Sequence, residues 1–84
     1  MDEADRGIPA LVRAIVAGLV DDPEQITIKE TSTGDNLLIE VSVAPNDVGK
    51  VIGRHGRVVK SIRALARAAA TLRGPAHVDV EIVN

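Results

Sequence analysis

The sequence predicts a small α+β domain in which a three-stranded sheet carries helices on one face. Apolar residues recur at helical spacing in two long stretches and alternate with polar residues in three short ones. Glycine, proline, aspartate and asparagine separate these stretches. A short helix precedes the second long one, so the element order is α-β-β-α-α-β. No repeat, linker or low-complexity segment interrupts the 84 residues. We therefore expect one domain over residues 1–84, with a flexible acidic N-terminus at residues 1–7.

The first half of the chain predicts one helix and a β-hairpin. Residues 8–19 have the spacing of an amphipathic helix, which residues 21–23, Asp-Asp-Pro, bring to an end. Residues 26–29 and 37–43 alternate as strands that bury one face. The short turn-forming stretch 32–36 between them favours antiparallel pairing.

The second half predicts a short helix, a long helix and a last strand. Residues 45–47 supply helix-start chemistry for a helix over residues 48–52, which Gly53 ends. The long helix covers residues 57–72, and residues 78–82 alternate as the strand. On the long helix the sequence predicts a buried face opposite a basic face of Lys60, Arg63 and Arg67; the buried face consists of Val58, Ile62, Leu65, Ala69 and Leu72.

Composition excludes several classes of function. The chain has no Phe, Tyr or Trp, which argues against RNA binders that stack bases on aromatic rings. With no cysteine and two widely separated histidines, we expect neither a metal site nor a cofactor. The sequence also has no H-E-x-x-H, Walker-type or G-x-S-x-G motif, so we expect no catalytic residues and no small-molecule substrate.

The N-terminal region carries no targeting signal that we can identify. Its first five residues are acidic where a secretory signal would be basic. The apolar stretch over residues 11–20 is too short to span a bilayer and contains Arg13. We therefore expect a soluble cytoplasmic protein with no membrane partner.

The net charge of −2 conceals a strong asymmetry. Residues 48–74 contain seven of the ten cations and none of the twelve acids. Basic charge confined to one segment of an acidic chain favours a local contact with a polyanion. A solvated helix face is the alternative, and charge alone does not exclude it.

Residues 49–58, Gly-Lys-Val-Ile-Gly-Arg-His-Gly-Arg-Val, are the most informative segment. Gly53 and Gly56 can adopt positive φ and let a ligand approach the main chain closely. Main-chain N–H groups and the positive end of a helix dipole would then face a phosphate. Arg54 and His55 add side-chain donors, and His55 donates from both nitrogens only when it is protonated. We therefore expect a mild pH dependence of binding.

This segment, between two helices and in this element order, resembles the G-x-x-G loop of the KH domain in its type II, or prokaryotic, form. The lead-in at residues 44–50, Ala-Pro-Asn-Asp-Val-Gly-Lys, is similar to that of the small stand-alone bacterial KH proteins of the KhpA (YlqC-like) family. The resemblance implies a clamp for about four nucleotides of single-stranded RNA. Neutralising two to four phosphates predicts a salt slope of about −1.4 to −2.8.

The resemblance also implies which residues bind RNA. An apolar groove would hold the bases between the loop helices and a strand from residues 37–43. Lys60, Arg63, Arg67 and Arg73 are expected to steer RNA, and of these we include Lys60 in the binding set. The complete expected set is Gly49, Lys50, Val51, Ile52, Gly53, Arg54, His55, Gly56, Arg57 and Lys60. For Val51 and Ile52 a place in the core is the competing interpretation.

By the same resemblance the protein would be an RNA chaperone or post-transcriptional regulator linked to cell elongation and division. It would form a homodimer, a heterodimer with a larger KH-containing protein of the KhpB (Jag) type, or both. The alternative is a KH-fold interaction and dimerisation module with little RNA binding of its own. The basic loop favours RNA binding over this alternative.

Overall fold

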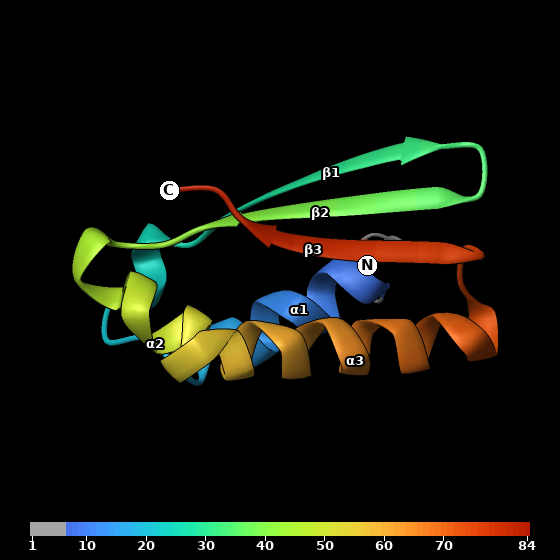
Figure 1. Cartoon of the computed structure of the whole chain (residues 1–84). Helices are drawn as coiled ribbons and strands as arrows, with labels where there is room; N and C mark the ends of the chain where they lie inside the picture. The colour runs from blue at the N-terminus through green and yellow to red at the C-terminus, as the bar shows by residue number, and fades with distance from the viewer. Residues whose placement is uncertain (1–6) are drawn as a thin grey trace.

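A computed structural model of the chain describes residues 7–84, so the acidic segment 1–6 lies outside the described residues. The predicted element order is confirmed (Figure 1). Three single turns of 3-10 helix, η2, η3 and η4, join some of the elements; they cover Pro23–Gln25, Pro45–Asp47 and Arg54–Gly56. The helices are α1 (Ile8–Ala17), α2 (Val48–Ile52) and α3 (Arg57–Arg73), and the strands are β1 (Thr27–Thr33), β2 (Asn36–Ser42) and β3 (His77–Ile82).

The sheet is mixed and has the order β1-β2-β3. β1 and β2 form the predicted antiparallel hairpin, which begins at the pair Thr33 and Asn36 and turns through Gly34 at φ 59°. β2 and β3 pair in parallel, with Ile39 opposite Val80. A parallel pair requires a crossover connection, and here that connection contains α2, the G-x-x-G loop and α3. The predicted functional segment therefore lies in the connection that joins two paired strands, β2 and β3.

Both long helices lie on one face of the sheet, as predicted (Figure 1). The core is aliphatic, with Val12 and Val16 of α1 fully buried against the alternate residues of the strands. The alternation predicted for β2 and β3 is confirmed by burial of their inward residues: Leu37, Ile39, Val41, Val78 and Val80. No helix within residues 7–84 is long and apolar enough to cross a membrane.

The predicted buried face of α3 is partly wrong. Ile62 is buried, but Leu65 is 52% exposed and Leu72 is 85% exposed. Val59 and Ala66 are buried instead, one position further along the helix in each case. The small side chain of Ala66 lets α3 lie close to the sheet, so the helix turns its larger leucines outward.

α3 also turns arginines toward the edge of the sheet. The His77 N–H donates to the Asp35 carbonyl, so the odd-numbered residues of β3 direct their N–H and C=O groups toward β2. The N–H and C=O groups of the even-numbered residues therefore point to the unpaired edge of β3. Arg63 Nε donates to the Val80 carbonyl at 2.7 Å, and Arg67 Nε donates to the Val78 carbonyl at 3.1 Å. The predicted basic face is therefore partly a cap on β3.

Candidate nucleic-acid interface

The G-x-x-G loop has an unusual backbone. Three of its four residues have positive φ: Gly53 at 76°, His55 at 59° and Gly56 at 73°. His55 is the one non-glycine residue with positive φ within residues 7–84, and a side chain in this region costs about 1–2 kcal/mol. Strain of this kind gathers at ligand-binding sites.

Gly53 is required by packing as well as by φ. A Cβ built on Gly53 would lie 2.5 Å from Cγ2 of Val58 and 2.9 Å from its backbone nitrogen. A Cβ on Gly56 would have room, because its nearest neighbours are 3.9 Å away, but its φ of 73° is unfavourable for any side chain. The two glycines therefore allow the chain to leave α2 and enter α3 within one tight turn.

The start of α3 leaves several backbone donors free. Its N-cap residue, Gly56, has no side chain to cap the helix, and the first turn contains no acid. The Gly56 N–H donates to the Gly53 carbonyl at 3.1 Å, whereas we find no acceptor among residues 7–84 for the N–H of Arg54 or His55. The positive end of a 17-residue helix and these unpaired N–H groups have the chemistry that anions require.

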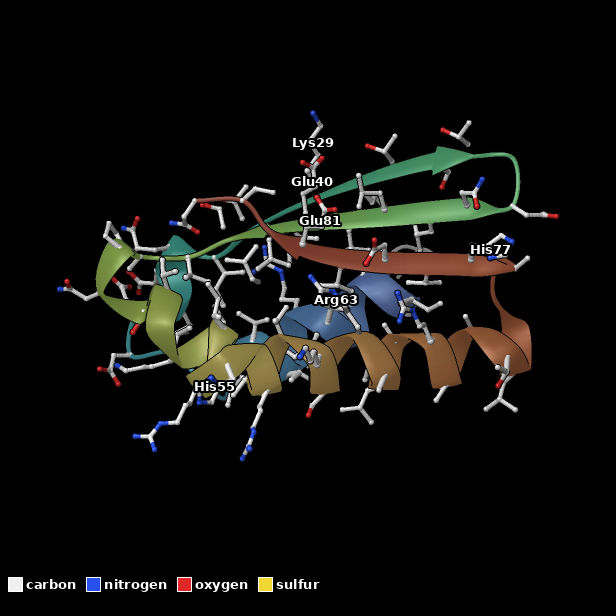
Figure 2. All side chains as sticks on the ribbon, in the orientation of Figure 1. Lys29, Glu40, His55, Arg63, His77 and Glu81 are labelled. Atoms are coloured by element: carbon white, nitrogen blue, oxygen red, sulfur yellow. The ribbon has the colours of Figure 1, made fainter. Side chains whose placement is uncertain are left out.

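The side chains around the loop are basic and accessible. Arg54, His55, Arg57 and Lys60 are all exposed, and Figure 2 shows His55 at the end of the molecule opposite His77. Gly49, one turn before the loop, has no atom within 4 Å of the position that a Cβ would take. The structure thus brings the predicted cations together beside an open, side-chain-free surface on α2.

Lys50 lies beside this surface but is engaged elsewhere. Its Nζ forms ion pairs with Asp21 and with Asp47, the latter at 3.0 Å. Asp47 is buried, and its two oxygens accept the N–H groups of Asp21 and Asp22 at 3.1 Å each. The network joins α2 to the turn after α1. The ammonium of Lys50 thus has two carboxylate partners that stabilise the fold, and a phosphate contact by Lys50 stays a prediction.

Opposite shifts in pKa follow from this network. The N–H of Asp21, followed by the Lys50 ammonium and the N–H of Asp22, holds the pKa of Asp47 below its usual value although burial opposes them. Hydrogen bonds to Asp21 and then Asp47 raise the pKa of Lys50. Both groups are charged at neutral pH, and each stabilises the other.

The structure separates two of the residues predicted to line the groove, Val51 and Ile52, by their burial. Val51 is fully buried in the core, so the core interpretation holds for it, whereas Ile52 is 36% exposed and available to a ligand. The strand predicted as the far wall, in residues 37–43, is β2, which is paired on both sides and has no free edge. The strand beside α2 and α3 is β3, so the expected groove would have β3 and not β2 as its far wall.

Sequence reasoning missed two arrangements. One is the role of Asp47, one of the three residues 45–47 predicted to supply helix-start chemistry. It is the N-cap residue of α2, but its carboxylate makes no capping bond and accepts the N–H groups of Asp21 and Asp22. The other is the cluster of Arg63, Arg67 and Asp79, in which both arginines lie within 4 Å of the Asp79 carboxylate. Only the conspicuous i, i+4 spacing of the arginines was visible in the sequence. Within residues 7–84 no group of three His, Cys, Asp or Glu is placed to hold a metal ion.

A helix-bounded G-x-x-G loop beside the edge of a three-stranded sheet defines the class of protein as a KH domain. The family described as "KhpA/KhpB, KH domain" matches residues 9–82. The chain belongs to this family, which confirms the resemblance and the fold inferred from the sequence.

Curated relatives cover most of the chain. The chain is 44% identical over 73 residues to the RNA-binding protein KhpA of Caldanaerobacter subterraneus subsp. tengcongensis, covering 87% of this chain and 96% of that protein. It is 47% identical over 62 residues to the RNA-binding protein KhpA of Oceanobacillus iheyensis, covering 74% of this chain and 83% of that protein. The relative in Chlamydia pneumoniae, also an RNA-binding protein KhpA, is 42% identical over 70 residues, or 83% of this chain and 88% of that protein.

One solved structure supports the fold. A crystal structure of Era from Aquifex aeolicus superposes with a TM-score of 0.63 at 23% identity. The match covers 90% of this chain but 30% of Era, so the chain corresponds to one part of that larger protein.

Proposed function

We propose that this protein binds single-stranded RNA without catalysis, by clamping the phosphate backbone on the loop Gly53-Arg54-His55-Gly56. The observation that carries the proposal is the loop itself. It has three positive φ angles, and the helix that follows it starts without a side-chain cap and without an acid in its first turn. The names of the relatives, RNA-binding protein KhpA, support the same ligand.

The roles of the residues follow from their positions. The N–H groups of Arg54 and His55 and the start of α3 bind one phosphate, and the exposed side chains of Arg54, His55, Arg57 and Lys60 bind its neighbours. The bases enter between α2 and the edge of β3, over Gly49 and Ile52. At this end of β3 the outward N–H and C=O of Ile82 have no partner among residues 7–84 and are free to pair with a base.

Reversing the charge of the clamp tests this function. Binding of a short single-stranded RNA to the wild-type protein and to Arg54→Asp/His55→Asp is measured by fluorescence anisotropy at two salt concentrations. The double variant is expected to stay folded, because both side chains are exposed, and to lose binding through repulsion of phosphate. Lys29→Asp, an exposed change on β1, is the control. Retained affinity in the folded double variant would refute the loop assignment.

We also propose that the protein pairs, with itself or with a larger KH-containing protein, through the outward face of α3. Leu65 and Leu72 lie two turns apart on this face and are the most exposed large apolar side chains of the helix. The exposed small residues Ala64, before Leu65, and Ala68, between the two leucines, extend the apolar surface. Single exposed leucines are common, but a stripe of this kind marks a contact surface.

Pairing is tested by light scattering after size-exclusion chromatography. Leu65→Lys is expected to be monomeric at concentrations where the wild type is dimeric, and Thr31→Lys on the open sheet face is the matched control. A monomeric wild type would leave the larger partner as the only candidate. Because one clamp binds weakly, pairing would raise avidity for RNA.

A cytoplasmic role as an RNA chaperone or regulator linked to cell elongation and division is the biological setting that we propose.

A further inference from the structure

A second surface feature lies at the end of the molecule away from the G-x-x-G loop. The end of α3 and the start of β3 border an open hollow of about 590 Å³. Its polar side chains are Asn36, Arg67, Thr71, His77 and Asp79, and its apolar ones include Leu38 and Ala76. A volume of this size is in the range of sites that hold small organic groups. The proposed clamp uses none of these residues.

A row of cations joins the two ends of the molecule. Lys60, Arg63 and Arg67 follow one another at intervals of three and four residues on α3, so they lie along one side of the helix. The bonds of Arg63 and Arg67 to β3 show that this is the side next to the strand edge. Figure 2 shows Arg63 midway between His55 at one end and His77 at the other. The row therefore leads from the proposed clamp to the hollow, along a strand of about 20 Å.

The other faces of the sheet are less suited to a polyanion. Lys29, Glu40 and Glu81 stand in one row across the open sheet face, where Glu40 is opposite both other residues in the strand register (Figure 2). That face therefore carries two carboxylates beside one cation. A strand of RNA that leaves the clamp along α3 therefore meets a row of cations that the open sheet face does not offer.

We propose that the hollow holds one further nucleotide of the bound RNA, beyond the four that the clamp holds. This inference rests on the proposed function. The Arg67 side chain is 59% exposed. Its Nε donates to the Val78 carbonyl and its Nη2 lies 3.7 Å from Asp79, so other N–H groups of its five remain for a phosphate. Asn36, Thr71 and His77 offer donors and acceptors to a base, and Ala76 and Leu38 give it an apolar wall.

The charge of Asp79 opposes a phosphate, but two arginines share this carboxylate. Arg63 Nε lies 3.5 Å and Arg67 Nη2 lies 3.7 Å from its Oδ1. The cluster therefore carries net positive charge. The same Asp79 oxygen also accepts the Val80 N–H at 2.9 Å, which holds the carboxylate against the strand.

The test compares a tetranucleotide with a hexanucleotide of the same base. Binding of tetrauridylate and hexauridylate to the full chain is measured by fluorescence anisotropy for the wild type, Arg67→Gln and His77→Ala. Both variants are expected to bind the hexamer about three- to five-fold more weakly and the tetramer as the wild type does. Arg67→Gln should also reduce the salt slope for the hexamer by about 0.7. Lys29→Ala, a cation on the far strand β1, should change neither.

A direct readout locates the extra nucleotide. The backbone amide signals of Thr71, Ala76 and His77 in two-dimensional NMR should shift with the hexamer and not with the tetramer. The inference would be overturned if the variants lowered the affinity for both oligonucleotides equally, or for neither. In that case tetramer binding that depends on Arg54 and His55 would still support the proposed clamp. Absence of tetramer binding by the wild type would overturn the proposed function and this inference together.

Discussion

Arg63 Nε lies 2.7 Å from the carbonyl oxygen of Val80, so a side chain of α3 occupies the free edge of β3. An unpaired strand edge is a template for unwanted pairing with other chains, and proteins block such edges with charged groups. Arg67 repeats the contact one turn further along, at Val78. The two arginines leave the Ile82 end of the strand open, which is the end beside the proposed clamp.

Removing this cap is expected to destabilise the fold. Arg63→Met keeps much of the apolar stem but leaves the Val80 carbonyl without its donor. We expect a loss of about 1 kcal/mol in the free energy of unfolding, because the bond is charge-assisted but part of the side chain is exposed. Urea unfolding followed by circular dichroism measures it. Lys60→Met, a change at an exposed cation with no recorded side-chain bond within residues 7–84, is the control, and equal midpoints would contradict the capping role.

Gly49 and Gly53, four residues apart in the sequence, should respond oppositely to substitution by alanine. Gly49→Ala places a methyl group in open space within α2, so we expect a gain of about 0.5 kcal/mol in stability. The same methyl group would stand where RNA approaches the main chain, so affinity should fall. Gly53→Ala would instead collide with Val58 at positive φ and cost about 2 kcal/mol or more.

Both effects of Gly49→Ala must be measured on the same preparation, by thermal unfolding and by RNA titration. The proposed groove predicts higher stability together with weaker binding. A stabilised protein with unchanged affinity would show that RNA does not pass over α2. An unaffected Gly53→Ala protein would show that the tight approach to Val58 can relax.

The Asp47 network predicts how stability depends on pH. The folded pKa of Asp47 is lowered, so its contribution is complete above its unfolded value and is lost as pH falls through the lower folded value. The folded pKa of Lys50 is raised, so its contribution is complete below its unfolded value and is lost as pH rises through the higher folded value. Stability should therefore fall in acid below about pH 4 and in strong base above about pH 10.

Asp47→Asn tests the acid limb. The amide cannot replace a buried carboxylate that accepts two N–H groups and a lysine, so the melting temperature at neutral pH should fall. The difference between the variant and the wild type should shrink as the pH is lowered. Asp35→Asn, at an exposed position in the β1-β2 turn, is the control. A pH-independent difference would mean that the charge of Asp47 is not what stabilises the network.

Binding of RNA should strengthen as the pH is lowered from 8 to 5.5. A protonated imidazole donates hydrogen bonds from both ring nitrogens and a neutral one from a single nitrogen, whereas phosphate diesters keep their charge over this range. His55→Gln should give a flat pH profile in anisotropy titrations with tetrauridylate. His77→Gln should keep the wild-type profile, because His77 lies at the other end of the molecule (Figure 2). Identical profiles for the wild type and His55→Gln would refute this role.

Patterns within single elements predicted most of the fold. The alternation of Leu37, Ile39 and Val41 gave one strand face, and Gly53 marked the end of α2. The errors concern relations between elements. A helical wheel cannot tell that Ala66 is buried and Leu65 half exposed, because that depends on how α3 is rotated against the sheet. The pairing order, which makes β3 and not β2 the edge strand, is likewise absent from local patterns.

The candidate site divides in the same way. The loop residues Gly53 and Gly56 were predictable because positive φ selects glycine. The positive φ of His55 could not be predicted from the sequence, since nothing in a histidine side chain requires that conformation. The partner of Lys50 was hidden too, because Asp21 lies 29 residues away and the two meet only after α1 and α2 have packed.

The parallel pairing of β2 and β3 makes the clamp a long-range structure. Both ends of the segment that contains it are fixed in one ladder, from the Asp35 carbonyl and His77 N–H at one end to Val41 and Val83 at the other. The clamp cannot persist when β3 detaches, so any ligand of the clamp binds only molecules in which that ladder is closed. RNA should therefore slow amide hydrogen exchange along the whole of β3, including residues that the RNA never touches.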